Sequence, residues 1–293
     1  MKKEELEKFS VDISIDRVIE ILVEFRSICQ PNIELLKRTE LRKFPYFLLS
    51  TLLRIDVNVK SLIVQFPHFK AEFAYKLPIN LILRSIVSDY LTIEYLLTFK
   101  DPMDDADTAV INEIKVLNLD FIKFQEAILI EELTYLKNKD VQPWSQDKIN
   151  EKLNQFYSEN SDVFIEDKGN YTLRPIKYFR ETTAPRILEE GRLRNSKITE
   201  KFKFDRLKSV GLIEFAMPTF LPFKYFSQFQ HPTSNMDDLI MSDPKIIDNR
   251  MILMAIDLIF IVTIQIFRNT ITNEELERKI KECQENLVKL IRK

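Results

Sequence analysis

A serine and a histidine four residues apart are the side chains whose spacing best suits chemistry. Ser227 and His231 lie in the segment Tyr225-Phe-Ser-Gln-Phe-Gln-His-Pro, and the whole chain has only 2 histidines. If this segment is helical, residues four apart share a face and their polar groups can meet. Histidine can transfer a proton near neutral pH, and a serine hydroxyl can be an activated nucleophile. The spacing therefore marks a candidate site, although it does not specify a reaction.

A second polar group lies in the apolar stretch from 77 to 99, where Arg84 and Ser88 share one helical face. A buried arginine needs a compensating group, because an unpaired charge in a protein core is costly. The candidate partners are Asp89, Glu94, Asp257 and the Tyr225–His231 segment. Two interpretations stay open. The group is either an internal network that fixes helix packing or a polar pocket for an anion or nucleotide-like ligand, lined by Arg84, Ser88, Tyr225 and His231.

Arg84-Ser85 with Asp89, followed far downstream by Tyr225, Ser227 and His231-Pro232, resembles a pattern in bacterial all-helical families that are distantly similar to HEPN-like bundles. The resemblance implies an all-helical fold and says little about function. The residues themselves support, as an alternative function, a hydrolase or ribonuclease with His231 as general acid/base, assisted by Arg84 or Lys224. HEPN ribonucleases place an arginine four to six residues before the histidine, where it stabilises phosphate charge. Neither histidine of this chain has an arginine in that window. The catalytic candidates His231, Arg84 and Ser227 thus depart from the family pattern.

Metal and nucleotide cofactors are not expected from the motifs. Carboxylate-bridged metals in helical bundles use Glu-x-x-His, but Gln65 and Gln228 stand three residues before the two histidines, and no HExxH or CxxC occurs. The 3 glycines are isolated and form neither a GxGxxG nor a P-loop pattern. We therefore predict no metal and no cofactor.

The stretch from Lys168 to Lys208 is locally basic, with twelve Lys or Arg against five Asp or Glu. Such a segment can follow a phosphate backbone, and nearby aromatic residues can stack on bases. A solvated charged face is the alternative interpretation. Nucleic acid or an acidic protein is the partner that this stretch suggests, with Arg192, Arg194, Lys197 and Lys201 as the candidate contacts. The sequence therefore predicts a non-catalytic interaction or regulatory protein, with the hydrolase or ribonuclease as the alternative.

Composition and charge indicate the compartment of the chain and whether it crosses a membrane. A formal net charge of −2 provides no global attraction to nucleic acid or to an anionic membrane. The N-terminus lacks the apolar run of a secretory signal, and Cys29 and Cys283 fit a reducing compartment better than a disulfide framework. The apolar run from Met251 to Phe267 contains Asp257, which is costly in lipid, so it is read as a buried core helix. These observations predict a cytoplasmic protein without a membrane span.

Helical periodicity dominates the elements that must position these residues. Apolar residues recur three and four apart from Ile15 to Cys29, after which Pro31 is expected to end the helix or begin the next. Mostly apolar stretches that predict helices run over 46–66, 77–99, 109–137, 210–229 and 251–267, and 145–160 is predicted to be a polar helix. One β-hairpin is predicted where two short β-prone runs flank a turn containing Gly169.

The C-terminal segment reads as a capped amphipathic helix. It opens with a capping-box pattern, Thr272 to Glu275, and its apolar residues alternate four and three apart. This spacing fits a helix docked on the bundle or, alternatively, the seam of a homodimer. The predicted fold is mainly α: a single domain, 1–293, built as a multi-helix bundle with one small β-hairpin in a polar, locally basic insertion at about 144–208.

Overall fold

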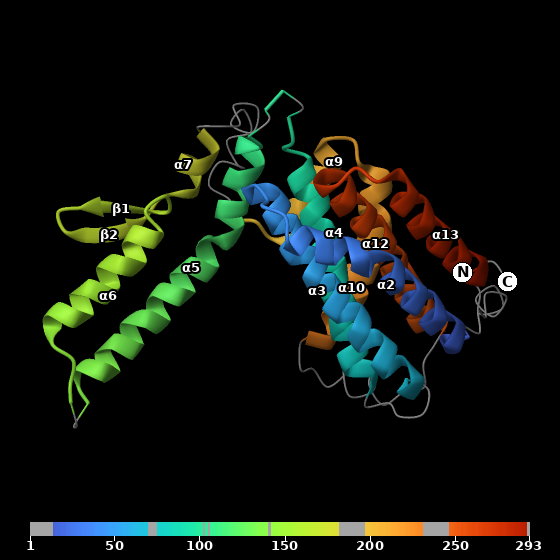
Figure 1. Cartoon of the computed structure of the whole chain (residues 1–293), viewed down its shortest axis with the longest axis horizontal. Coiled ribbons are helices and arrows are strands. Elements are labelled where there is room, and N and C mark those ends of the chain that lie inside the picture. The colour runs from blue at the N-terminus through green and yellow to red at the C-terminus, as the bar shows by residue number, and fades with distance from the viewer. Residues whose placement is uncertain are drawn as a thin grey trace. The chain divides into compact units, whose positions relative to one another are not determined.

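The structure, a computed structural model, is mainly helical, as predicted. It describes residues 14–69, 75–101, 103–104, 106–139, 142–181, 197–230 and 246–291. Within these ranges ten α-helices and one two-stranded antiparallel hairpin are present (Figure 1). By internal contacts the chain divides into two compact units, 1–98 with 200–293 and 99–199. The second unit begins well before the insertion that the sequence predicted at about 144–208.

The first unit is a bundle around α12 (Ile246–Thr270), which packs against α3, α4, α10 and α13. Ile256, Ile259 and Phe260 on α12 are fully buried. Among the described residues one helix, Asn249–Thr270, is long and apolar enough to cross a membrane, but 72% of its most apolar window is buried inside the molecule. This burial is what the prediction of a core helix requires. The other helices of the unit are α2 (Ile15–Lys37), α3 (Lys43–Gln65), α4 (Lys76–Leu97), α9 (Glu200–Ser209), α10 (Ile213–Ser227) and α13 (Glu274–Ile291), with short 3-10 helices η1 (Phe66–His68) and η3 (Gln228–Gln230).

Pro31 does not end a helix. It lies inside α2, which continues to Lys37. Proline is costly inside a helix because it removes a backbone donor and crowds the preceding turn. The prediction of a boundary at Pro31 was therefore wrong. Val18, Leu22, Phe25 and Cys29 before the proline and Ile33 and Leu36 after it are all buried, so the apolar stripe continues across it and tertiary packing supports the helix.

The C-terminal helix α13 docks on the bundle. Its apolar residues Leu276, Ile280, Cys283 and Leu287 are buried, and the helix packs on α2 and α12. This face is therefore not available as a homodimer seam. The cap also differs from the predicted capping box: Asn273 Oδ1 accepts a hydrogen bond from the Leu276 amide at 3.0 Å, so the cap is one residue later than Thr272.

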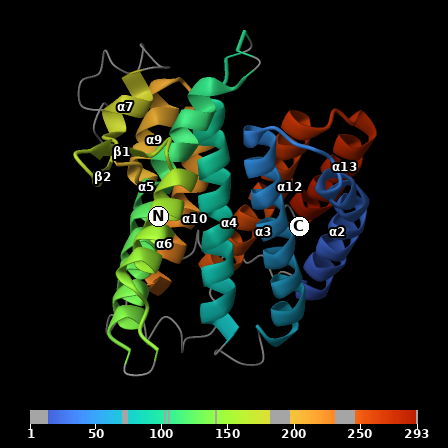
Figure 2. The same ribbon diagram turned by 60° about the vertical axis from the view of Figure 1, so that its left-hand side comes forward.

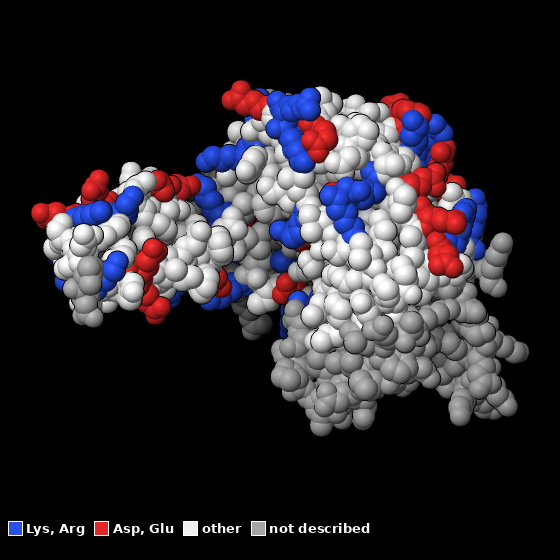
Figure 3. Space-filling view, turned by 60° about the horizontal axis from the view of Figure 1, so that its bottom comes forward, with Lys and Arg blue, Asp and Glu red and all other residues white. Residues whose placement is uncertain are grey.

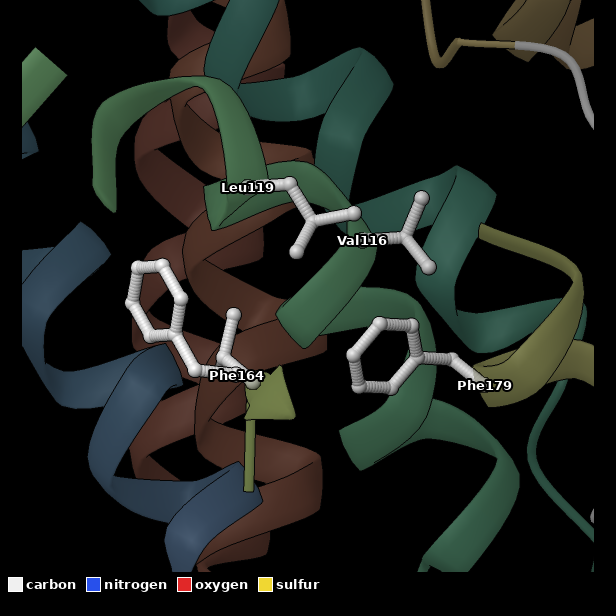
Figure 4. Close-up of a cluster of buried hydrophobic side chains, with 5 residues drawn as sticks. Val116, Leu119, Phe164 and Phe179 are labelled. Atoms are coloured by element: carbon white, nitrogen blue, oxygen red, sulfur yellow. The ribbon is translucent and has the colours of Figure 1, made fainter. Parts of the chain in front are cut away.

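The second unit contains α5 (Thr108–Lys137), α6 (Gln146–Glu159), the strands β1 (Phe164–Asp167) and β2 (Asn170–Leu173), and α7 (Ile176–Glu181). The hairpin turns through Lys168 and Gly169, with φ of 51° and 80°. Two consecutive positive φ angles are typical of the tight turns that match strand twist, and glycine adopts them without strain. A small core joins helix α5 to the hairpin and α7: Val116, Leu119, Phe164 and Phe179 lie around a common interior space (Figure 4).

Candidate functional site

Helix α4 carries a row of polar residues at every fourth position. Neighbours in this row lie on the same side of the helix, and the row winds slowly around it. Helix α4 packs against α3, α9, α10 and α12, and Figure 2 shows it beside α3. The row therefore lies where the first unit packs its helices together, and it consists of Lys76, Asn80, Arg84, Ser88 and Thr92.

The C-terminal half of this row bonds to α9. The Ser88 hydroxyl donates to Glu200 Oε1 at 3.2 Å. Lys203 Nζ donates to Thr92 Oγ1 at 2.9 Å, and Lys203 is only 5% exposed. Burial lowers the pKa of the Lys203 ammonium, against the charge of the neighbouring Glu200. Ser88, a predicted ligand contact, is thus part of an internal network between two helices.

Arg84 contacts the segment that the sequence singled out. Its Nε donates to Ser227 Oγ at 3.4 Å, and its guanidinium lies over the Phe223 ring, 5.3 Å from the centroid. The Ser227 hydroxyl itself donates to the Phe223 carbonyl at 2.6 Å. The Ser227 hydroxyl thus bonds to its own helix and to Arg84 at the same time. His231 lies outside the described residues, so the spacing argument for a Ser227–His231 pair stays a prediction.

Two of the acids proposed as partners of Arg84, Asp89 and Asp257, form hydrogen bonds with other residues. Asp89 accepts three bonds from Arg54, two from Nε at 2.9 and 3.1 Å and one from Nη2 at 2.5 Å. Burial nevertheless raises the pKa of the Asp89 carboxyl. Asp257 accepts from Gln284 at 2.8 Å, and burial raises its pKa as well. Nothing in the sequence spacing identified Arg54, which lies on a different helix from Asp89.

Three buried polar atoms of this region have no hydrogen-bond partner among the described residues: Asn80 Nδ2, Tyr225 Oη and Glu94 Oε1. Glu94 is 7% exposed, and burial raises its pKa to about 7. A carboxyl that stays protonated to neutral pH can avoid the cost of a buried charge. Within the described residues, the first unit thus contains an internal polar network in which these three atoms are unsatisfied.

The basic residues of the segment 168–208 separate into structural and exposed groups. Arg180 is 1% exposed and donates from Nε to Glu113 Oε1 at 2.8 Å, while Lys203 is buried against α4. Of the candidate contacts, Lys197 pairs with Asp120 at 2.9 Å and Lys201 is exposed, whereas Arg192 and Arg194 lie outside the described residues. On the face drawn in Figure 3, basic and acidic side chains are interspersed among the coloured residues. The exposed lysines of the segment within the described ranges are Lys168, Lys177, Lys197, Lys201 and Lys208.

A cavity of about 350 Å³ lies in the second unit beside the hairpin. The end of α6 and the two strands line it together with Arg174, which follows the hairpin. Tyr157 and Tyr171 stack there with centroids 4.0 Å apart, and Arg174 lies over the Tyr178 ring at 4.5 Å. Sequence reasoning missed this cavity, because only the fold of the hairpin onto α6 brings these residues together.

Neither a metal centre nor a recognised family emerges from the described chain. Within those residues no group of three or more His, Cys, Asp or Glu side chains is placed to hold a metal ion. No family model, curated protein or solved structure matches the chain.

Proposed function

We propose that this chain is a non-catalytic interaction protein that binds single-stranded nucleic acid through the basic segment 168–208. The observation that carries the proposal is the stack of the Arg174 guanidinium on the Tyr178 ring, 4.5 Å from its centroid. Tyr178 is 42% exposed, so part of its ring is open to a ligand. Cations and aromatic faces side by side are the combination that holds unpaired strands, because lysines follow the phosphates and rings stack on bases.

The exposed lysines supply the second requirement. Lys168 in the hairpin turn lies six residues before Arg174 in the chain, Lys177 on α7 lies three residues after it, and both are exposed. The buried Arg180 and Lys203 support the fold and are not counted as contacts. An acidic protein would use the same lysines, but it would not need the aromatic rings, and this difference favours nucleic acid.

The test is the binding of a short fluorescent single-stranded oligonucleotide, measured by anisotropy over a range of salt concentrations. We expect the triple variant Lys168→Gln, Lys177→Gln, Lys197→Gln, all in the second unit, to bind more weakly and to reduce the salt slope by about 2, or about 0.7 for each lost phosphate contact. Lys201→Gln, which lies in the first unit, is measured separately. The control is Lys279→Gln, Lys281→Gln, Lys289→Gln on α13, which removes the same charge from another helix.

Three outcomes would count against the proposal. Binding that does not depend on salt would show that phosphate contacts do not contribute to the affinity. An equal loss of affinity in the α13 control would show that these contacts do not lie in the basic segment. If polyglutamate competes as well as the oligonucleotide at matched charge, the partner is acidic protein and not nucleic acid. A variant with Arg192→Gln and Arg194→Gln tests the two remaining candidate contacts in the same assay.

A second candidate function is an HEPN-like hydrolase or ribonuclease with His231 as general acid/base. The contact that favours it is Arg84 Nε to Ser227 Oγ, because Ser227 stands four residues before His231. In this proposal Arg84 would stabilise a developing phosphate charge and His231 would transfer the proton.

RNA cleavage by the purified protein tests this candidate. We expect His231→Ala to lower the rate by about 10²–10⁴-fold, the usual worth of general acid–base catalysis. Arg84→Ala should also be impaired, and Arg84→Lys should recover part of the rate because the charge is kept. His68→Ala is the matched control, since His68 is the other histidine and is exposed on η1. Undiminished cleavage by His231→Ala would refute the candidate, as would an inactive wild-type protein.

A further inference from the structure

The cavity beside the hairpin has the features of a site for one flat, polar molecule. Its volume of about 350 Å³ is near the lower end of the range for small-molecule sites, about 300–1,000 Å³. It is lined by Tyr157, Ser158, Ser161, Phe164, Ile165, Glu166, Tyr171 and Arg174. The lining therefore includes three aromatic residues, two serines, one glutamate and one arginine.

The aromatic part of the lining is held in place. The Tyr157 hydroxyl donates to Glu126 Oε1 at 2.8 Å, and the Tyr157 ring meets Phe164 edge-on at 5.0 Å. The Tyr171 ring stacks on Tyr157 with an interplanar angle of 9°. Burial and the bond to Glu126 raise the pKa of Tyr157 to about 12, so the phenol stays protonated and keeps donating. The two rings form a fixed platform that a flat ligand can extend by stacking.

Strand pairing places an acceptor next to this platform. Glu166 on β1 is directly opposite Tyr171 on β2, and residues opposite each other project to the same side of a hairpin. Phe164 projects to that side too, because side chains two apart in a strand share a face. Phe164 contacts Tyr157 on α6, so this is the side of the hairpin that meets the helix. A ligand stacked at Tyr171 would therefore have the Glu166 carboxylate at its edge.

Arg174 supplies a donor on the same lining. Its backbone amide bonds to the Val163 carbonyl at 2.9 Å, and its guanidinium is held over Tyr178. Its Nε is buried and has no hydrogen-bond acceptor among the described residues. Because Nε has almost no accessible surface, a ligand acceptor would bond to the terminal nitrogens of the guanidinium, which carries five N–H donors in a planar fork.

We propose that this cavity binds one unpaired guanine base of the strand. Guanine is flat enough to stack on Tyr171, its N1–H and N2 amino group can donate to the Glu166 carboxylate, and its O6 and N7 can accept from Arg174. Adenine lacks both the N1–H and the O6, so it satisfies neither charged residue in this way. The inference rests on the proposed binding of single-stranded nucleic acid and adds base selection to it.

The experiment compares three fluorescent strands of equal length: all thymine, thymine with one central guanine, and thymine with one central adenine. We expect the guanine strand to bind about tenfold more tightly than the other two, the usual discrimination of a bidentate base contact. Glu166→Gln should abolish this preference without changing the salt slope. Asp167→Asn, which removes the same charge from the next residue of the hairpin, should keep the preference.

The outcomes separate base selection from strand binding. Equal, salt-dependent binding of all three strands would refute the guanine site and leave the proposed function standing. A titration with the nucleoside guanosine, followed through the Tyr171 ring signals by NMR, tests the cavity without a phosphate backbone. If no strand binds, the proposed function fails, and the guanosine titration alone decides the site. Guanosine binding that is lost in Glu166→Gln supports the cavity, and no shift at Tyr171 overturns it.

Discussion

At the scale of single residues, Glu94 is an acid whose environment disfavours its charged form. It is 7% exposed, its Oε1 has no partner among the described residues, and burial raises its pKa to about 7. In the unfolded chain a glutamate ionises near about pH 4.3. Between these two values the unfolded chain has released a proton that the folded protein still holds. The free energy of unfolding should therefore fall as pH rises through this window and stay lower above it.

Glu94→Gln should remove this dependence, because the amide has nearly the same shape and does not titrate. We expect the variant to be more stable than the wild type above about pH 7, by up to about 3 kcal/mol, and to match it more closely below about pH 4.5. Urea unfolding across this range measures the difference. Glu132→Gln, an exposed glutamate of α5, is the control. If Glu94→Gln and the wild type lose stability in parallel as pH rises, the carboxyl is not the cause.

At the scale of elements, periodic patterns located most helices, because an amphipathic stripe encodes the buried face locally. The hairpin was also predictable, since Gly169 marks a turn between two β-prone runs. The continuation of α2 through Pro31 and the cap of α13 at Asn273 were not predictable in this way. Packing on both sides of the proline keeps α2 helical, and either Thr272 or Asn273 can cap α13 by sequence alone.

Contacts between elements explain why the candidate site was only partly predictable. Arg84 and Ser88 could be placed on one face from their spacing. Their bonds to Ser227 and Glu200 cross 143 and 112 residues of sequence, and no local pattern encodes such pairs. The same limit hid the cavity beside the hairpin, where a stacked tyrosine pair joins α6 to β2. Residue types along the chain indicated a basic segment, but only the fold separates its structural cations from its exposed ones.

At the scale of the whole molecule, the division into two units predicts that a substitution in one unit can destabilise that unit alone. Arg180 and Glu113 join α7 to α5 inside the second unit, with side chains only 1% and 3% exposed. Arg180→Leu breaks this buried ion pair by removing one of its members, which typically costs about 3–5 kcal/mol. Trp144, the only tryptophan of the chain, belongs to the same unit, so its fluorescence reports that unit's unfolding.

We expect Arg180→Leu to shift the Trp144 transition to clearly lower urea, while most of the helical circular dichroism, which comes from the first unit, unfolds as in the wild type. Lys197→Ala is the control, because it breaks an ion pair whose side chains are 71% and 72% exposed, and such pairs contribute about 0–1 kcal/mol. If both signals shift together in Arg180→Leu, the two units unfold as one cooperative structure. If neither shifts, the buried pair adds little to the stability of α7 on α5. A shift of the fluorescence transition alone would show that the unit with the hairpin and its cavity can be perturbed without loss of the helical bundle.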